Sequence, residues 1–168
     1  MLELLDVYTA DRKRTGRIIS RGGEVSEGEH LLVVHVCVMN GRQELLIQRR
    51  QLNKERYPGC WNLSAGGFVQ SGERSPEAAL RELREEVGLS VSSDALQLLF
   101  TEPFSYVLDD FYLVRCSMPL SAFTMQPEEV SELRWASRAE VEAMVTDGRF
   151  VDYPLSCIGQ TYDLASSL

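Results

Sequence analysis

Three glutamates stand within five consecutive positions of one predicted helix. They are Glu82, Glu85 and Glu86, in the stretch RELREEVGL. Carboxylates three or four residues apart on a helix are neighbours, and each like-charge pair is unfavourable by roughly 0.2–0.5 kcal/mol. Two kinds of partner could offset this repulsion. One is arginines on the same helix, and the other is a divalent cation, since carboxylate oxygens are hard ligands.

The helix that carries these glutamates is predicted to start at Ser75 and Pro76 and to stop at Gly88. Serine can cap a helix, proline is tolerated at its first position, and glycine favours its end. The apolar face repeats every four residues: Ala79, Leu83 and Val87. Because residues three and four apart stack over one another, the glutamates project together from an adjoining face.

A loop precedes the helix, from Gly67 to Gly72, and ends at Glu73. Its two glycines bend freely, so backbone carbonyls can approach the volume that the glutamates share. Carboxylates, a carbonyl and waters are ligands that magnesium accepts. The competing interpretation is a solvated helix in which Arg81 and Arg84 form salt bridges with the glutamates.

The wider spacing favours the metal. Gly67, five residues, Glu73, seven residues and RELREEVGL resemble the Nudix box at every defined position. The matching residues are Gly67, Glu73, Arg81, Glu82, Leu83, Glu85, Glu86, Gly88 and Leu89.

This resemblance implies an α/β Nudix fold over most of the chain, with a mixed β-sheet sandwiched between helices. It also implies a box that binds Mg²⁺ or Mn²⁺ and positions a diphosphate-containing small molecule. The three glutamates are then the expected metal ligands, and the carbonyl of Gly67 is a further candidate. Arg81 and Glu73 are expected to form a salt bridge that holds the loop on the helix.

The segment LLIQRRQLNKERYPGCWNLSAGGFVQSGE resembles a narrower branch, the proteins similar to isopentenyl-diphosphate isomerase. By that match, Arg50 and Lys54 are the expected diphosphate contacts, and exposed loop charge is their alternative role. The isomerase reaction itself is not expected. The position of its cysteine holds Gly66, and the position of a histidine two residues later holds Phe68.

Further acidic residues are candidates for the site. Asp110, beside Asp109, could supply another ligand or a general base, and a polar strand entry or turn is the alternative. Glu128 and Glu129 resemble an acidic segment that precedes the last strand in many Nudix proteins, where one glutamate sometimes acts as the base. Surface acid is the default interpretation of that pair.

Five aromatic residues could stack a base or pack a prenyl chain, although aromatic residues are more often part of the core. They are Trp61, Phe68, Phe104, Tyr106 and Phe111. The substrate is therefore left open between a nucleoside diphosphate derivative and another small diphosphate. A domain that senses a nucleotide without turnover is the alternative to a hydrolase, and an isomerase is a third.

Strands and helices are predicted without regular alternation, which favours one mixed α/β domain over residues 1–168. The predicted strands are 2–9, 31–40, 44–50, 60–69, 96–104, 109–118 and 131–137. The strands 31–40 and 44–50 are expected to form a buried hairpin. A turn is expected at 11–16, after the first strand. Glycines are expected to interrupt strand 60–69. Two more helices are expected, one over 137–148 and one after Pro154.

Composition limits the partners. The chain of 168 residues is 44% hydrophobic and carries a net charge of −8, which argues against a nucleic-acid polymer or an anionic membrane as the main partner. Four scattered cysteines and the lack of a signal-like or membrane-spanning stretch favour a cytoplasmic location. The oligomeric state is left open, a homodimer included.

Overall fold

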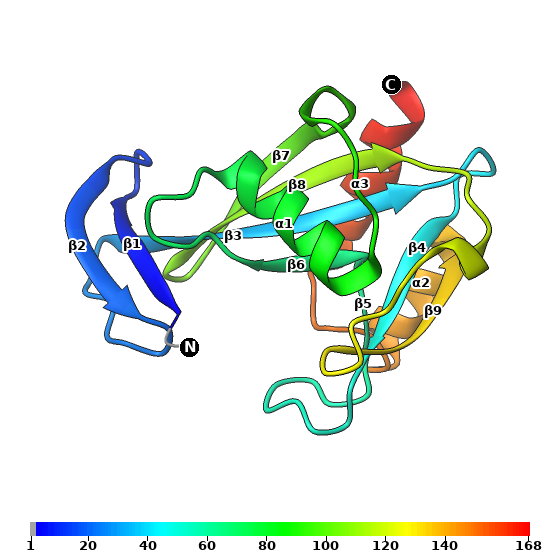
Figure 1. The fold of residues 1–168 in the computed structure, drawn as a ribbon, viewed down its shortest axis with the longest axis horizontal. Helices are drawn as coiled ribbons and strands as arrows, with labels where there is room; N and C mark the ends of the chain where they lie inside the picture. Colours follow the sequence, from blue (N-terminus) through cyan, green and yellow to red (C-terminus); the bar gives the residue numbers. More distant parts are fainter. Residues whose placement is uncertain (1–2) are drawn as a thin grey trace.

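Strand β3 (Glu29–Met39) is the central strand of this computed structural model, which describes residues 3–168 (Figure 1). β8 (Val107–Arg115) pairs with it in parallel along nine residues, and β6 (Ala65–Phe68) pairs with it antiparallel. β1 (Leu4–Thr9) joins its beginning and β4 (Leu45–Arg50) its end. The sheet is therefore mixed.

The remaining strands extend the sheet from these partners. β2 (Arg14–Ser20) pairs with β1, and β7 (Gln97–Phe104) pairs with β8. β4 lies between β5 (Trp61–Asn62) and β9 (Val130–Ala136). Short 3-10 turns occur at Ser93–Ala95 and Leu120–Ala122.

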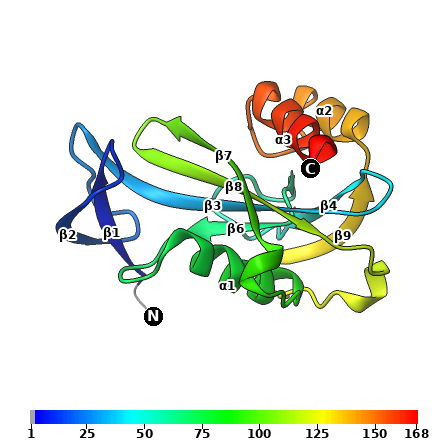
Figure 2. The ribbon, with the colours of Figure 1, turned by 90° about the horizontal axis from the view of Figure 1, so that it is seen from above.

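Helices cover both faces of the sheet. Helix α1 (Ser75–Val87) lies on one face, and α2 (Arg138–Thr146) and α3 (Leu155–Ser167) lie together on the other (Figure 2). The predicted α/β fold, a mixed sheet between helices, is confirmed, and so are the three predicted helices. No helix of residues 3–168 is long and apolar enough to cross a membrane.

The apolar sequence of β3 follows from this layering. Alternate side chains of a strand point to opposite faces. Val34, Val36 and Val38 enter the core under α1, whereas Cys37 and Met39 enter the core under α2 and α3. A strand that is covered on both faces needs apolar residues at consecutive positions, as the unbroken run predicts.

Two sequence predictions about strand pairing are corrected. β3 and β4 form a hairpin only at the pair Met39–Leu45, because β3 is hydrogen-bonded along its length to β6 and β8. The predicted turn at 11–16 is shorter, since β2 already starts at Arg14. Distant pairings of this kind leave no local sequence signal.

Helix α1 starts at Ser75, as predicted, but its cap differs from the prediction. Arg74, not Ser75, occupies the N-cap position, and its amide donates to the Glu77 carboxylate at 2.9 Å. The hydroxyl of Ser75 is used elsewhere, in a 2.5 Å hydrogen bond to buried Asp110. A buried carboxylate depends on protein donors, whereas the free amides of an exposed helix end can donate hydrogen bonds to water.

The glycines of β6 lie within the strand and do not interrupt it. A Cβ at Gly66 would lie 2.6 Å from the carbonyl oxygen of Val34 on the neighbouring strand. A side chain there would push the two strands apart. This crowding explains why a glycine occupies position 66.

We expect Gly66→Ala to lower the free energy of unfolding by about 1–3 kcal/mol, because the added methyl group overpacks the β3–β6 contact. Urea unfolding measures the change. Gly41→Ala is the matched control, since a Cβ there meets only Ser117 Oγ at an ordinary 3.6 Å. Equal stability of the two variants would contradict the strand-contact argument.

Candidate active site

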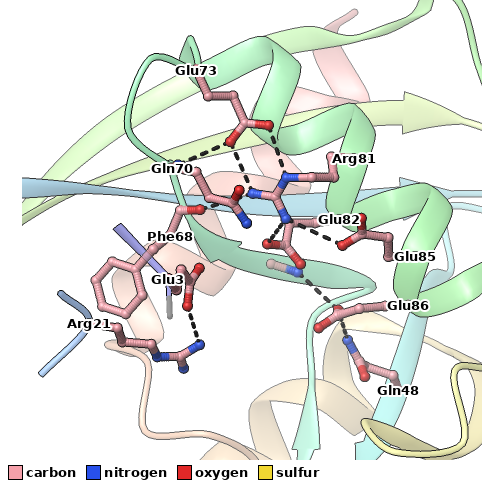
Figure 3. Close-up of polar contacts among 11 residues, drawn as sticks. Glu3, Arg21, Gln48, Phe68, Gln70, Glu73, Arg81, Glu82, Glu85 and Glu86 are labelled. Carbon is pink, nitrogen blue, oxygen red and sulfur yellow. Dashed lines mark hydrogen bonds and ion pairs between the residues drawn. The ribbon is translucent and has the colours of Figure 1, made fainter. Parts of the chain in front are cut away.

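Arg81 joins the loop, the strand and the helix that form the candidate site (Figure 3). Its guanidinium binds both carboxylate oxygens of Glu73, at 2.9 and 3.0 Å, and donates to the carbonyl of Phe68 at 3.1 Å. It also contacts Glu82 at 2.6 Å and Glu85 at 3.4 Å. The predicted Arg81–Glu73 salt bridge is therefore present in the structure, and one cation serves three carboxylates.

Among residues 3–168, the donors that hold Glu86 are neutral. Its Oε2 accepts a hydrogen bond from Gln48 Nε2 at 2.6 Å and from the amide of Gly66 at 3.1 Å. These donors come from β4 and β6, so two strands fix the orientation of a side chain on α1. Such fixed orientation is what a metal ligand or a catalytic carboxylate requires.

Glu82 and Glu86 are both buried, and the positive charge near them does not offset the effect of burial on their carboxyl groups. Burial, together with the neighbouring charge of Glu82, raises the pKa of Glu86 to about 8, although the hydrogen bonds from Gln48 and Gly66 oppose the shift. Burial likewise raises the pKa of Glu82, although Arg81 opposes that shift. At neutral pH the folded chain therefore holds carboxyl groups that favour a proton or a cation.

Burial alone would lower the pKa of Arg81, but Glu73 and Glu82 raise it above its usual range. The guanidinium thus stays charged while it supports the loop. Arg81 and Glu73 hold the loop against the helix. Both side chains are largely buried, at 15% and 16% exposure.

Gly67 lies directly beneath Glu82. A Cβ at this position would come within 2.6 Å of Glu82 Cδ, so any side chain would displace the carboxylate. The carbonyl of Gly67 was predicted to face the glutamates, but the pairing of β6 with β3 turns it toward β3. Gly67 pairs with Val34 of β3, whereas the amide of Gly66 points away from β3 to Glu86. Because the N–H and C=O of one strand residue point the same way, the carbonyl facing the glutamates is that of Gly66.

A cavity of about 540 Å³ opens over the glutamates. Five acidic and four basic side chains line it, and its polar lining suits a small charged ligand. They are Glu3, Glu82, Glu85, Glu86 and Glu129, with Arg21, Arg50, Lys54 and Arg81. Because acidic side chains outnumber basic ones, the cavity does not favour an anionic ligand unless further positive charge is present.

Arg50 and Lys54, the predicted diphosphate contacts, line the cavity that contains the glutamates. Lys54 Nζ forms a 2.6 Å ion pair with Glu129, and Arg50 Nε donates to the carbonyl of Arg56 at 3.1 Å. Glu129 lines the same wall, so of the two later glutamates this one joins the site. Glu128 lies on an adjoining cavity.

The pair Asp109 and Asp110 is divided between the two faces of the sheet. Asp110 accepts two hydrogen bonds of 2.6 Å from Arg12 and one from Thr101. Burial alone would raise the pKa of Asp110, but these donors, Arg12 above all, lower it. Asp109 lies 3.4 Å from His35 on the opposite face. Neither aspartate lines the cavity with the glutamates, so Asp110, a predicted ligand or base, lies outside the proposed site.

The residues fit a divalent cation that keeps part of its water shell. Within residues 3–168, no three His, Cys, Asp or Glu side chains converge closely enough to hold a metal alone. Glu82 and Glu86, with the Gly66 carbonyl, would supply a partial set of oxygen ligands. Mg²⁺ usually retains several waters and uses only one or two carboxylates, so a partial set is sufficient.

Sequence reasoning did not find three residues at the site. Gln48 of β4 is 2% exposed, and a buried polar side chain needs a hydrogen-bond partner, but the sequence does not mark it because Arg49 and Arg50 follow it directly. Glu3 and Arg21 reach the cavity from the β1–β2 hairpin and pair with each other at 2.9 Å. No local pattern marks them, because their position depends on how the hairpin packs.

Arg81→Lys is expected to lower the free energy of unfolding by roughly 2–4 kcal/mol, because an ammonium cannot bind Glu73 and the Phe68 carbonyl at once. Chemical denaturation gives the change. Arg84→Lys on the same helix is the control, since Arg84 is exposed. If Arg81→Lys is as stable as the control, Arg81 does not fasten the loop to the helix.

These features define the class of the protein: an α/β sheet between helices, with a glutamate-rich helix held over a glycine strand by one arginine. Residues 29–156 match the family model of the NUDIX domain. An uncharacterised Nudix hydrolase of Listeria monocytogenes is 38% identical over 152 residues, which cover 90% of each chain. The chain belongs to the Nudix family, and its relatives support a Nudix hydrolase. Nudix hydrolases generally use divalent metal ions.

The likeness to the isomerases is weaker but present. The isopentenyl-diphosphate Delta-isomerase of Shigella boydii is 29% identical over 109 residues, covering 62% of this chain and 60% of the isomerase. The crowding at Gly66 leaves no room for a cysteine side chain in this arrangement of β3 and β6. The chain thus resembles that branch without providing its thiol.

Solved structures share the fold. The crystal structure of DR0079 from Deinococcus radiodurans has a TM-score of 0.76 and 26% identity, covering 88% of this chain and 91% of that one. The NUDIX domain of Shewanella oneidensis NrtR, complexed with ADP ribose, has a TM-score of 0.58 and 20% identity. The match to the NrtR domain covers 85% of this chain and 90% of the NrtR chain.

Proposed function

We propose that the protein is a magnesium- or manganese-dependent hydrolase that cleaves the diphosphate linkage of a nucleoside diphosphate derivative or a related small diphosphate. One observation carries the proposal. The glutamates of α1 and the cations Arg50 and Lys54 line one cavity although they are far apart in the sequence. Carboxylates for a metal and cations for phosphate oxygens are the two groups that such a reaction requires.

The residues have distinct proposed roles. Glu82 and Glu86 hold the cation with the Gly66 carbonyl, and Glu85, whose side chain is 45% exposed, faces the solvent side. Arg50 and Lys54 bind the diphosphate oxygens as charge-assisted donors. A bound cation supplies positive charge to the phosphate oxygens and lowers the pKa of a water ligand. Arg81 and Glu73 keep the loop and the glutamates in position.

The charge balance of the cavity supports a role for the cation in binding. A diphosphate adds negative charge to a cavity that already contains more acids than bases. A divalent cation offsets that charge, so substrate binding should require metal. A nucleotide derivative is a suitable ligand for this fold, since the NrtR domain was crystallised with ADP ribose.

The test is incubation of the protein with Mg²⁺ and a panel of small diphosphates, with products resolved by mass spectrometry. The panel contains nucleoside di- and triphosphates, nucleotide sugars, dinucleotides and prenyl diphosphates. We expect phosphate or a nucleoside monophosphate from one class. Binding without turnover across the panel would instead indicate a sensing domain. A shifted double bond in a prenyl diphosphate would indicate an isomerase.

A further inference from the structure

The β1–β2 hairpin lies outside the residues that match the family model, which begin at residue 29. It nevertheless reaches the cavity over the glutamates, since Glu3, Leu4 and Arg21 line that cavity. Gln70 and Ser71, from the loop between β6 and α1, line it as well. Figure 1 shows the hairpin beside this loop, at the end of the sheet away from β4 and β9. The hairpin and the loop therefore share one cavity.

Asp6 of β1 is a buried carboxylate in an otherwise apolar strand. Its neighbours Leu5 and Val7 pack into a hydrophobic cluster, whereas Asp6 bonds to the loop. It is 8% exposed and accepts hydrogen bonds from the hydroxyl of Ser71 at 2.9 Å and from the amide of Gly72 at 3.0 Å. A buried carboxylate without donors is costly, so these contacts hold the loop against the strand.

The hairpin makes two further hydrogen bonds to the loop. The amide of Ser71 donates to the carbonyl of Leu4 at 2.8 Å, and Arg14 Nη2 donates to the carbonyl of Glu73 at 2.8 Å. Arg14 Nε also lies 3.1 Å from the carboxylate of Asp6, so each side chain helps to orient the other. Four hydrogen bonds from β1 and β2 thus fix the loop before α1.

Glu73 connects the position of this loop to the glutamates of α1. Its carboxylate accepts a hydrogen bond from the amide of Gln70 at 3.0 Å, which closes the loop, and both its oxygens bind Arg81. Arg81 in turn contacts Glu82 at 2.6 Å. A chain of contacts therefore joins Asp6 to a carboxylate that is proposed to hold the cation. Outer partners of this kind orient metal ligands.

The hairpin is also anchored at its tip, so it can support the loop. Arg12 has a φ of 63°, in the left-handed region that residues other than glycine seldom adopt. In this conformation its guanidinium reaches the fully buried Asp110 with two hydrogen bonds of 2.6 Å. Next to the tip, Tyr8 and Thr9 pair with β3. The strand that carries Asp6 is therefore fixed to the body of the protein independently of the loop.

We propose that Asp6 is a positioning residue of the active site, which holds the loop 70–73 so that Glu73 and Arg81 orient the glutamates around the cation. This inference rests on the proposed function for the role of the glutamates. It makes the β1–β2 hairpin part of the catalytic structure, although the hairpin supplies none of the proposed metal ligands. The task of Asp6 is to keep its hydrogen bonds to the loop in place, and its charge is not required.

The test variants separate position from charge and from stability. Asp6→Ala removes both hydrogen bonds to the loop. Asp6→Asn can keep them, because its oxygen accepts from the amide of Gly72 and its amide group donates to the hydroxyl of Ser71. Asp11→Ala removes an exposed carboxylate of the same hairpin. Val7→Ala removes core packing from the same strand but leaves the hydrogen bonds of the loop.

Two measurements need no turnover. Amide exchange followed by NMR should be roughly 5- to 10-fold faster for Ser71 and Gly72 in Asp6→Ala, about the effect of one lost hydrogen bond. Titration with Mn²⁺, followed by the EPR signal of the free ion, should show binding roughly 10-fold weaker in this variant. Asp6→Asn and Asp11→Ala should stay near the wild type in both measurements. Val7→Ala should lose stability but keep the Mn²⁺ affinity.

Turnover of the preferred diphosphate gives a third measurement. Asp6→Ala should lower kcat roughly 10-fold and change KM less, because Arg50 and Lys54 lie outside the hairpin and the loop. Arg14→Met is a milder variant of the same support, since the Arg14 side chain is 46% exposed. It should show the same pattern at a smaller size, and it decides the question if Asp6→Ala does not fold.

Three results would overturn the inference: Asp6→Ala matches Asp11→Ala in amide exchange and Mn²⁺ affinity, Asp6→Asn is as impaired as Asp6→Ala, or Val7→Ala weakens Mn²⁺ binding equally. The proposed function fails separately. If the exchange and Mn²⁺ patterns appear but the wild type hydrolyses nothing, Asp6 positions a metal site that is not a hydrolase. If the wild type hydrolyses a diphosphate and Asp6→Ala is unchanged, the hydrolase stands without this role of the hairpin.

Discussion

Glu86→Gln should lower kcat on the order of 10²- to 10³-fold, the loss typical of removing one charged group that acts in the transition state. Its oxygen Oε2 is fixed by Gln48 and by the amide of Gly66, so a glutamine can keep the position of the side chain. The glutamine lacks the negative charge that a hard cation requires. The loss should therefore appear in activity, while the variant still folds.

Steady-state kinetics with the preferred substrate measures the effect. Glu77→Gln is the matched control, because Glu77 lies on the same helix, is exposed and does not line the cavity. It should retain wild-type activity. If Glu86→Gln is as active as Glu77→Gln, the glutamates of α1 do not take part in the reaction.

The second large effect is the dependence of stability on pH and metal. Glu86 has a pKa of about 8 in the folded chain and about 4.3 when unfolded. Between these values the unfolded chain has released a proton that the folded chain retains, so a rise in pH favours unfolding. The contribution of Glu86 is fully present below the unfolded pKa. It is lost by the time the pH has risen through the folded pKa.

In the metal-free protein, this contribution should amount to on the order of 4 kcal/mol between about pH 4 and pH 8. Urea unfolding in EDTA should show the wild type losing stability over this range more steeply than Glu86→Gln, which cannot titrate. At about pH 8, Glu86→Gln should be the more stable of the two.

Magnesium should offset much of this loss in the wild type, because a cation that binds only the folded state stabilises it by mass action, by about 2.7 kcal/mol at one hundred times its dissociation constant. The wild type should gain stability and Glu86→Gln should gain little. Parallel pH profiles for the two proteins, unaffected by Mg²⁺, would show that the carboxyl of Glu86 is not confined as described.

The glutamates and Arg81 could be predicted from the sequence because helix geometry is local. Three and four residues separate the side chains that face one another, so the stretch RELREE defines one face without knowledge of the fold. The contact between Arg81 and Glu73 needs only the short loop before the helix. The three helices and most strands follow from periodicity for the same reason.

Contacts across the sheet could not be predicted in this way. Asp109 and Asp110 are adjacent in sequence but point to opposite faces of β8, and the partner of Asp110, Arg12, comes from the β1–β2 hairpin. Gln48 meets Glu86 only because β4 and β6 lie under α1. These positions depend on strand pairing between distant segments, which single residues do not reveal.

The directions of the Gly66 and Gly67 carbonyls could not be predicted from the sequence for a related reason. Both glycines indicate a close approach, but the direction of each backbone group depends on the register with β3. The register pairs Gly67 with Val34 and leaves Gly66 directed toward Glu86. A shift of one residue would exchange these directions.

The most direct test of the account is to locate a divalent cation in crystals of the protein soaked with Mn²⁺, by anomalous diffraction at the manganese edge. We predict a peak about 2–2.5 Å from oxygens of Glu82 and Glu86 and near the Gly66 carbonyl, and no peak there in crystals of Glu86→Gln. A wild-type map without a peak beside these glutamates, or with manganese bound only elsewhere, would contradict the account.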